Sequence, residues 1–134
     1  MSLTVSPALL SQAQQGDVSD AEFVGCIKSS LPYAYGLISD LSTRLNNGET
    51  AEGVNFLYNK TEPPSDEARG QLLRAMASDS MRAALQRHFG IRLAFQNCHA
   101  VGVFPQGREA DEQLQRFTST RAQLLNQSPE LVNC

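Results

Sequence analysis

Long apolar runs, an excess of positive charge and a regular cysteine pattern are all absent from this sequence of 134 residues. Its apolar stretches are short and interrupted by charge, and residues 1–16 lack the basic start and apolar core of a secretion signal. The formal net charge of −3 gives no overall attraction to nucleic-acid phosphates or to an anionic membrane. Three widely spaced cysteines are an odd number, so we expect no disulfide framework and a reducing, cytoplasmic setting.

The short motifs that hold metals and phosphates are absent too. The two histidines and three cysteines form no Cys-x-x-Cys or His-x-x-x-His pair, which argues against a structural zinc site. Neither Gly-x-Gly-x-x-Gly nor the P-loop sequence occurs, so ATP and NAD are not indicated. We therefore expect no cofactor and no metal.

The composition favours one folded domain over residues 1–134. Hydrophobic residues make up 41% of the chain and charged residues 19%, which suits one core and not a disordered segment. Residues 1–17 are expected to form a short arm lying on the domain, and residues 128–134 a loose tail.

Helix signals dominate the first half of the chain. Pro7 and Gly16 are placed to start and stop a short helix, and Ser19 with Glu22 forms a capping box for the next one. Pro32 predicts either a kink or the start of a new helix. An apolar stripe then predicts a long central helix that ends at Asn46-Asn47-Gly48.

The second half mixes helix and strand signals. Residues 48–64 are compatible with a short strand or a helical turn, whereas Ser65 and then Ser78 or Asp79 are helix caps. Alternation in residues 91–104 predicts an antiparallel hairpin, and a last helix is expected from about Arg108 to Leu125. The predicted fold class is α+β and predominantly α, with four to six helices around one core.

Cys98 and His99 are the first candidates for chemistry. An imidazole near a thiol can hold it as the nucleophilic thiolate, so Cys98 is a candidate reactive thiol with His99 or His88 as its partner. Neighbouring side chains on a strand point to opposite faces, however, and no third orienting group is identifiable. A structural turn with a partly buried cysteine explains the pair better.

Arginine supplies the clearest binding signal. Nine of the eleven basic residues are Arg, and five of them lie between residues 69 and 92. Guanidinium groups favour carboxylates and partner surfaces, although a solvated helix face with intrahelical pairs explains them as well. Three aromatic side chains could line the edge of an apolar groove or simply fill the core. Together with three of the arginines they are the candidate partner-binding residues: Arg69, Arg74, Arg82, Tyr33, Phe56 and Tyr58.

Two segments carry a resemblance to other proteins. They are Pro63-Pro64-Ser65-Asp66-Glu67-Ala68-Arg69-Gly70-Gln71-Leu72-Leu73-Arg74 and, further on, His88-Phe89-Gly90 with Leu93-Ala94-Phe95-Gln96-Asn97-Cys98-His99. The chain resembles small uncharacterised proteins of cyanobacteria and, within that group, carboxysome-assembly helpers of the CcmS type. This resemblance implies a cytoplasmic, non-enzymatic helper whose partner is a carboxysome shell protein.

The function expected from the sequence is the capture of a peptide or protein partner by a non-enzymatic binding or assembly-helper protein. Two alternatives stay open: a cysteine-dependent or redox enzyme that uses Cys98, and a structural subunit of a homo-oligomer. No catalytic residue is assigned, and neither nucleic acid nor membrane is expected as a partner.

Overall fold

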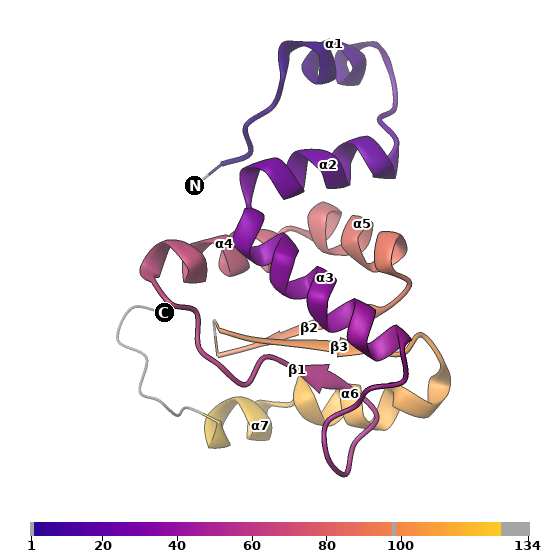
Figure 1. Ribbon diagram of the computed structural model, residues 1–134, viewed down its shortest axis with the longest axis vertical. Coiled ribbons are helices and arrows are strands. Elements are labelled where there is room, and N and C mark those ends of the chain that lie inside the picture. The colour runs from indigo at the N-terminus through magenta and orange to yellow at the C-terminus, as the bar shows by residue number, and fades with distance from the viewer. Residues whose placement is uncertain (1, 98, 127–134) are drawn as a thin grey trace.

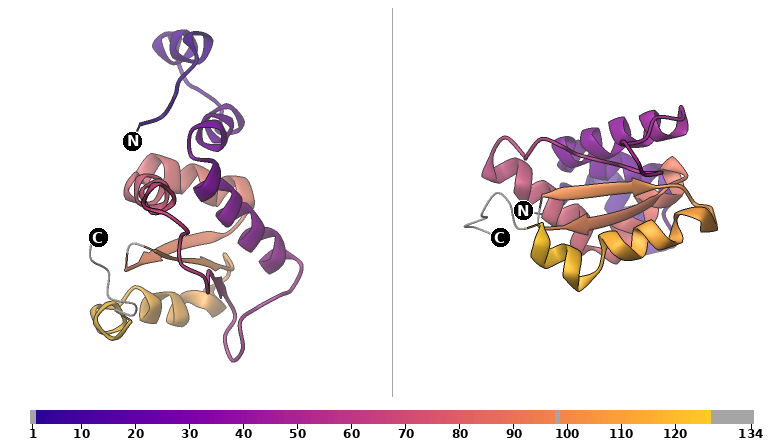
Figure 2. Two further views of the ribbon diagram at one scale, coloured as in Figure 1. Left: turned by 60° about the vertical axis from the view of Figure 1, so that its left-hand side comes forward. Right: turned by 90° about the horizontal axis from the view of Figure 1, so that it is seen from below.

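A small antiparallel sheet lies between two unequal layers of helices in the computed structural model, which describes residues 2–97 and 99–126 (Figure 1). Helices α3, α4 and α5 cover one face, α2 packs on α3 and α5, and α6 with α7 lies on the other face (Figure 2). The bounds are α1 Pro7–Gln15, α2 Asp20–Ser30, α3 Pro32–Asn46, β1 Leu57–Tyr58, α4 Asp66–Ala77, α5 Asp79–Phe89, β2 Arg92–Gln96, β3 Ala100–Phe104, the 3-10 turn η1 Arg108–Ala110, α6 Asp111–Phe117 and α7 Thr120–Leu125.

The strand order β1-β3-β2 leaves β1 and β2 at the two edges of the sheet. The β2–β3 hairpin pairs Leu93 with Val103, and β1 pairs Leu57 with the same Val103 from the other side. At the hairpin turn Asn97 has a positive φ of 55°, a conformation that asparagine adopts more readily than most residues. The predicted hairpin is confirmed. The ambiguous segment 48–64 contributes the two-residue strand β1, which joins the hairpin as the third strand of the sheet.

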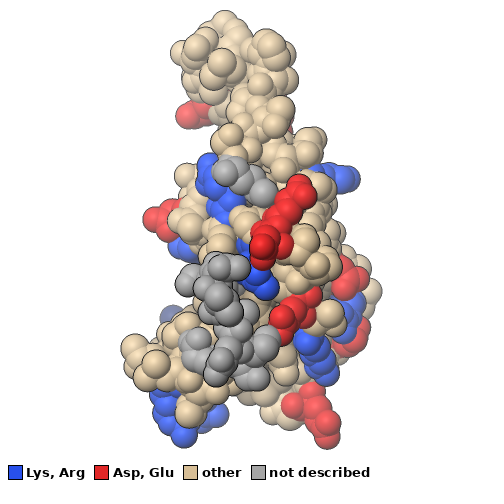
Figure 3. All heavy atoms as spheres, turned by 90° about the vertical axis from the view of Figure 1, so that its left-hand side faces the viewer, with Lys and Arg blue, Asp and Glu red and all other residues tan. Residues whose placement is uncertain are grey.

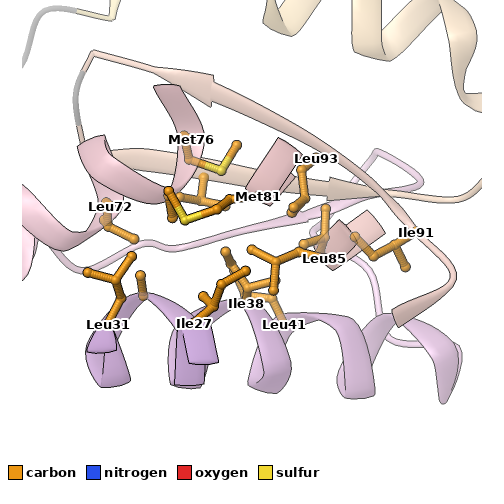
Figure 4. Packing of buried hydrophobic residues seen from close by; sticks show 14 of the residues in the cluster. Ile27, Leu31, Ile38, Leu41, Leu72, Met76, Met81, Leu85, Ile91 and Leu93 are labelled. Atoms are coloured by element: carbon orange, nitrogen blue, oxygen red, sulfur yellow. The ribbon is translucent and has the colours of Figure 1, made fainter. Parts of the chain in front are cut away.

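An aliphatic core fills the space between the sheet and the larger helical layer. Alternate sheet residues point into it, as the two-residue period of a strand requires. Figure 4 shows side chains from α2 to α5 and from β2 meeting there; those it labels are Ile27, Leu31, Ile38, Leu41, Leu72, Met76, Met81, Leu85, Ile91 and Leu93.

A second, aromatic core lies on the opposite face of the sheet. Phe56 stacks on Phe104 with ring centroids 4.4 Å apart, and Phe117 from α6 meets both rings edge-on. A Cβ at Gly102 would lie 2.7 Å from the Phe104 ring and 3.2 Å from the Phe117 ring. The absence of a side chain at Gly102 therefore lets α6 pack on β3.

Serine side chains start the helices where the sequence predicts them. Oγ of Ser19 accepts a hydrogen bond from the Glu22 amide, and Ser65 and Ser78 cap α4 and α5 in the same way. Gly90 ends α5 with a positive φ of 66°. The three predicted serine caps are confirmed.

Pro32 begins a new helix and does not kink an old one. Leu31, the residue before α3, has no side chain that can cap it. Instead Oε1 of Gln71 from α4 accepts hydrogen bonds from the Tyr33 and Ala34 amides, at 2.7 and 3.2 Å. A buried amide side chain from another helix thus satisfies the free donors at the start of α3.

The last helix is not continuous, contrary to the prediction for residues 108–125. It breaks after Phe117, because Thr118 and Ser119 hydrogen-bond the preceding carbonyls and Ser119 then caps α7 through the Ala122 amide. The predominantly α, α+β fold class is confirmed, and the split contributes to a total of seven α-helices in the described residues.

The N-terminal arm differs from the body of the domain. Helix α1 stands beyond α2 in Figure 1 and has no buried residue. Thr4 and Gln12 tie this arm to α2 through Ser30 and Glu22. The tail predicted for residues 128–134 lies outside the described residues.

Candidate functional site

The free edge of β1 presents backbone groups that face away from the sheet. The Asn59 amide donates to the Val101 carbonyl, so Asn59 faces β3, whereas the Phe56 carbonyl on the other side accepts from Ala51. Because successive residues of a strand alternate, Tyr58 faces outward like Phe56. Within the described residues the Tyr58 amide and carbonyl have no hydrogen-bond partner. The edge is therefore closed as far as Phe56 and open from Tyr58.

The opposite edge of the sheet is treated differently. The Leu93 amide of β2 also faces outward, but Oε1 of Gln86 from α5 accepts its hydrogen bond at 2.8 Å. This side chain occupies the position that an added strand would need. The β2 edge is thus closed at the Leu93 amide, whereas no side chain bonds the Tyr58 amide of β1 within the described residues.

A hollow of about 500 Å³ lies beside β1 on the side of α3. Tyr33 and Leu37 come from α3, Leu57 and Tyr58 come from β1, and Pro64 lies at its far end. Charged side chains complete the wall: the carboxylates Asp40, Glu49, Glu52 and Glu62 and the cations Arg44 and Lys60.

A larger hollow of about 760 Å³ lies beside β1 on the side of α6 and α7. Its aromatic wall is formed by Phe56, Tyr58 and Phe117. Polar side chains surround these rings: Asn59, Lys60, Thr61, Glu62, Gln96, Asn97, His99, Gln113, Arg116 and Asn126.

Residues 58–62 separate the two hollows, because each of them lines both. Asn59 fixes this segment to β3: its Oδ1 accepts from the Val101 amide and its Nδ2 donates to the His99 carbonyl, each at 2.7 Å. We call residues 58–62 the edge segment. It comprises the last residue of β1 and the four residues that follow, and it has a hollow on each side and an open backbone edge at Tyr58.

Charge is distributed unevenly around the edge segment. In the α3-side hollow Arg44 binds Glu49 through two nitrogens, at 3.0 and 2.7 Å, and also lies 3.5 Å from Asp40. These hydrogen bonds from Arg44 hold the pKa of Glu49 below its usual range. Glu52 and Glu62 form no ion pair within the described residues, so two uncompensated carboxylates remain in that wall.

The three predicted arginines do not line either hollow. Arg69 binds Asp66 at 2.9 Å, and Arg82 binds Asp79 and the Met76 carbonyl, at 2.7 and 2.6 Å. Arg74 is half-buried near the end of α4. On the face drawn in Figure 3, basic and acidic side chains are interspersed and form no single basic area. Arg69 is thus engaged by its own helix, and Arg82 is engaged by its own helix and by the last turn of α4.

The three predicted aromatic residues do lie around β1. Tyr33 and Tyr58 line the α3-side hollow together, and burial raises the pKa of Tyr33. Phe56 and Tyr58, with ring centroids 6.0 Å apart, line the hollow on the other face. The structure therefore places these side chains on both sides of the edge segment and not in one groove.

Cys98, the predicted reactive thiol, lies outside the described residues. His99 is buried, and its Nδ1 lies 2.6 Å from the Asn97 carbonyl. A carbonyl accepts hydrogen bonds, so in this contact Nδ1 of His99 carries a proton and donates it. This hydrogen bond within the hairpin turn therefore fixes the His99 ring.

No group of three or more His, Cys, Asp or Glu side chains that could hold a metal ion is found among residues 2–97 and 99–126. In the same part of the chain no helix combines the length and apolarity needed to cross a bilayer.

The comparison with protein families gives one match. Residues 1–134 match the family model KH_NucS_shadow, described as the NucS shadow ORF. Since the match covers the whole chain, this protein belongs to that family. No curated protein and no solved structure matches the chain significantly. The family description refers to an open reading frame and names no activity or ligand.

The family match corrects the resemblance drawn from the sequence. The chain is not shown to be a cyanobacterial or CcmS-type protein, and a carboxysome shell protein is no longer indicated as its partner. Local structure explains the similar residues at positions 63–74. Pro64 and Ser65 precede α4, and Asp66 and Glu67 suit its first turn. Such residues recur wherever a helix begins and do not identify a family.

The family label shares the letters KH with an RNA-binding module. KH modules clamp a nucleic-acid backbone with a Gly-x-x-Gly loop. No two glycines in this sequence stand three residues apart, and the connection between α4 and α5 consists of Ser78. The label therefore adds no motif for RNA binding to this chain.

Sequence reasoning missed the polar part of the site. Asn59, Lys60 and Glu62 were left unassigned because a two-residue strand has too few positions to show a period. The available signal was the apolar run Phe56-Leu57-Tyr58 followed by Pro63-Pro64. Proline is confined to sheet edges or to positions outside strands, so this pattern is typical of an edge strand.

Proposed function

We propose that this protein is a non-enzymatic binding protein that captures an extended segment of a partner protein as an added strand beside β1. The outward-facing amide and carbonyl of Tyr58 carry this proposal, because unpaired backbone groups at a sheet edge are a template for another strand. The proposal keeps the predicted partner class and the predicted residues Tyr33, Phe56 and Tyr58.

The two hollows support this mode of binding. An added strand sends successive side chains to opposite faces of the sheet. Alternate side chains of the partner would therefore enter the α3-side hollow and the aromatic hollow. Backbone hydrogen bonds would supply affinity, and the hollows would select the side chains.

The predicted arginines have no part in the proposal. Arg69 already binds a carboxylate of its own helix and Arg82 binds groups of α5 and α4, and none of the three arginines reaches the walls of the hollows. A cytoplasmic setting belongs to the proposal, since the cysteine usage favours a reducing compartment.

The test uses a library of random peptides displayed against the purified full chain, followed by affinity measurement for a selected peptide. Tyr58→Pro removes the outward N–H but leaves the ladder to β3, whose bonds come from Leu57 and Asn59. We expect about tenfold weaker binding, as for the loss of one hydrogen bond together with obstruction of the edge. Tyr58→Thr keeps the N–H and the strand propensity and is the matched control for loss of the ring.

Hydrogen exchange of the wild-type protein tests the same point without a substitution. The Tyr58 amide should exchange freely in the unbound protein and become protected when the selected peptide is added. Equal affinity of the Tyr58→Pro and Tyr58→Thr variants, together with an unprotected Tyr58 amide in the complex, would overturn the proposal.

A further inference from the structure

The charge around the edge segment points to the chemistry of the captured segment. Four carboxylates and two cations line the α3-side hollow. Arg44 is engaged by Glu49 and Asp40, so its charge is already balanced within the wall. Glu52 and Glu62 are exposed and have no ion pair within the described residues, and Lys60 alone opposes them.

The other hollow has a different character. It offers three aromatic side chains, Phe56, Tyr58 and Phe117, at the side of the same strand. Arg116 on its rim is paired with Glu112, which does not line the hollow. Lys60 and Glu62 line this hollow as well, one cation and one carboxylate, whereas Glu52 lines the α3-side hollow and not this one. The aromatic rings therefore favour an apolar or aromatic side chain here.

We infer that the captured segment is basic and alternating, with Lys or Arg side chains directed to the α3-side hollow and apolar or aromatic side chains directed to the Phe56–Phe117 hollow. This inference rests on the proposed edge binding, because the alternation follows from an added strand. Opposite charges across an interface raise the association rate and suppress wrong partners. The two glutamates would thereby select the partner, while the backbone edge holds it.

Two acetylated, amidated and fluorescein-labelled peptides test the inference: Thr-Val-Lys-Phe-Lys-Val-Thr and Thr-Val-Glu-Phe-Glu-Val-Thr. In low salt the lysine peptide should bind wild-type protein roughly fivefold more tightly, as expected for exposed charge pairs. The difference should shrink in 0.5 M NaCl, where the Debye length falls below about 5 Å.

A charge-reversed variant separates the local charge from the net charge of −3. Glu52→Lys plus Glu62→Lys should reverse the preference in favour of the glutamate peptide. Asp17→Lys plus Glu109→Lys changes the net charge equally at positions outside both hollows, and should preserve the preference for lysine.

The outcomes distinguish this inference from the proposed function. If both peptides bind equally and Tyr58→Pro weakens both, the edge mode stands and the charge inference is overturned. The inference also falls if the two double variants behave alike, since net charge would then explain the preference. If neither peptide binds, the charge inference fails, and the display experiment decides the edge mode separately.

Discussion

The two faces of the sheet are covered in different ways. On one face, side chains from α2 to α5 meet the strands in an extended aliphatic core whose central residues are fully buried. On the other face four buried residues, Phe56, Ala94, Phe104 and Ala110, form a thin core under α6, and neither α6 nor α7 has a buried residue of its own. The thin layer is also the one with the larger hollow. The aliphatic face thus holds most of the buried side chains, and the aromatic face holds the larger hollow.

The largest expected effect comes from the aliphatic face. Leu85→Ala removes a fully buried side chain of α5 and should lower the free energy of unfolding by about 2 to 5 kcal/mol. Denaturant unfolding followed by circular dichroism measures this, with the exposed Leu73→Ala on α4 as the control. A loss below about 1 kcal/mol would contradict the description of this core as closely packed.

Gly102→Ala tests the aromatic face. The new Cβ would lie 2.7 Å from a Phe104 ring that Phe56 and Phe117 hold in place, so we expect a loss of about 1 to 3 kcal/mol. Gly36→Ala on α3 is the matched control, because nothing lies within 4 Å of its Cβ position. That control should gain about 0.5 to 1 kcal/mol. Equal unfolding midpoints for the two variants would contradict the close packing of α6 on β3 at Gly102.

Leu114→Ala sharpens the difference between the layers. Leu114 is half-buried against the aromatic core, so its truncation should cost about 1 kcal/mol of global stability. Native-state hydrogen exchange should show faster exchange in α6 while the amides of α3 and α5 stay protected. Uniform acceleration over both layers would mean that the two faces open together.

The smallest effect is expected at the ion pair between α2 and α5. Arg87 binds both carboxylate oxygens of Asp20, at 2.6 and 2.9 Å, and these hydrogen bonds lower the pKa of Asp20. A lowered pKa in the folded state stabilises the protein above the ordinary pKa of Asp, and this contribution is lost as the pH falls through the folded-state value.

Arg87→Gln should therefore raise the pKa of Asp20 and flatten the decline in unfolding midpoint between about pH 4 and pH 2. Titration of the Asp20 carboxyl by NMR measures the first effect directly. Arg121→Gln, on the exposed surface of α7, is the control. An unchanged Asp20 pKa in the Arg87→Gln variant would show that the pair does not persist in solution.

Local sequence signals predicted most of the fold. The helix starts at Ser19, Ser65 and Ser78 were predicted correctly, because a cap is decided by neighbours within four residues. The hairpin was predicted by alternation on two adjacent strands. The break at Thr118 and Ser119 was missed, since the apolar spacing continues through it while the hydroxyl groups compete for the backbone.

The site depends on contacts that a sequence pattern does not contain. Pairing of Leu57 with Val103 joins segments far apart in the chain, and it is this pairing that makes β1 an edge. The aromatic residues were named without their arrangement, and Arg69 and Arg82 were named although near neighbours engage them. Composition indicated which side chains could bind, but the sheet order decides which of them share a hollow.

The amide of Gln71 at the start of α3 has a consequence for the folding route. Helix α3 obtains its hydrogen-bond acceptor from α4, a partner about forty residues further along the chain. The two helices should therefore consolidate in one cooperative step, and a fragment that ends before Ser65 should have a frayed α3. Chain elongation through α4 would then be the event that commits the nascent protein to its native helical layer.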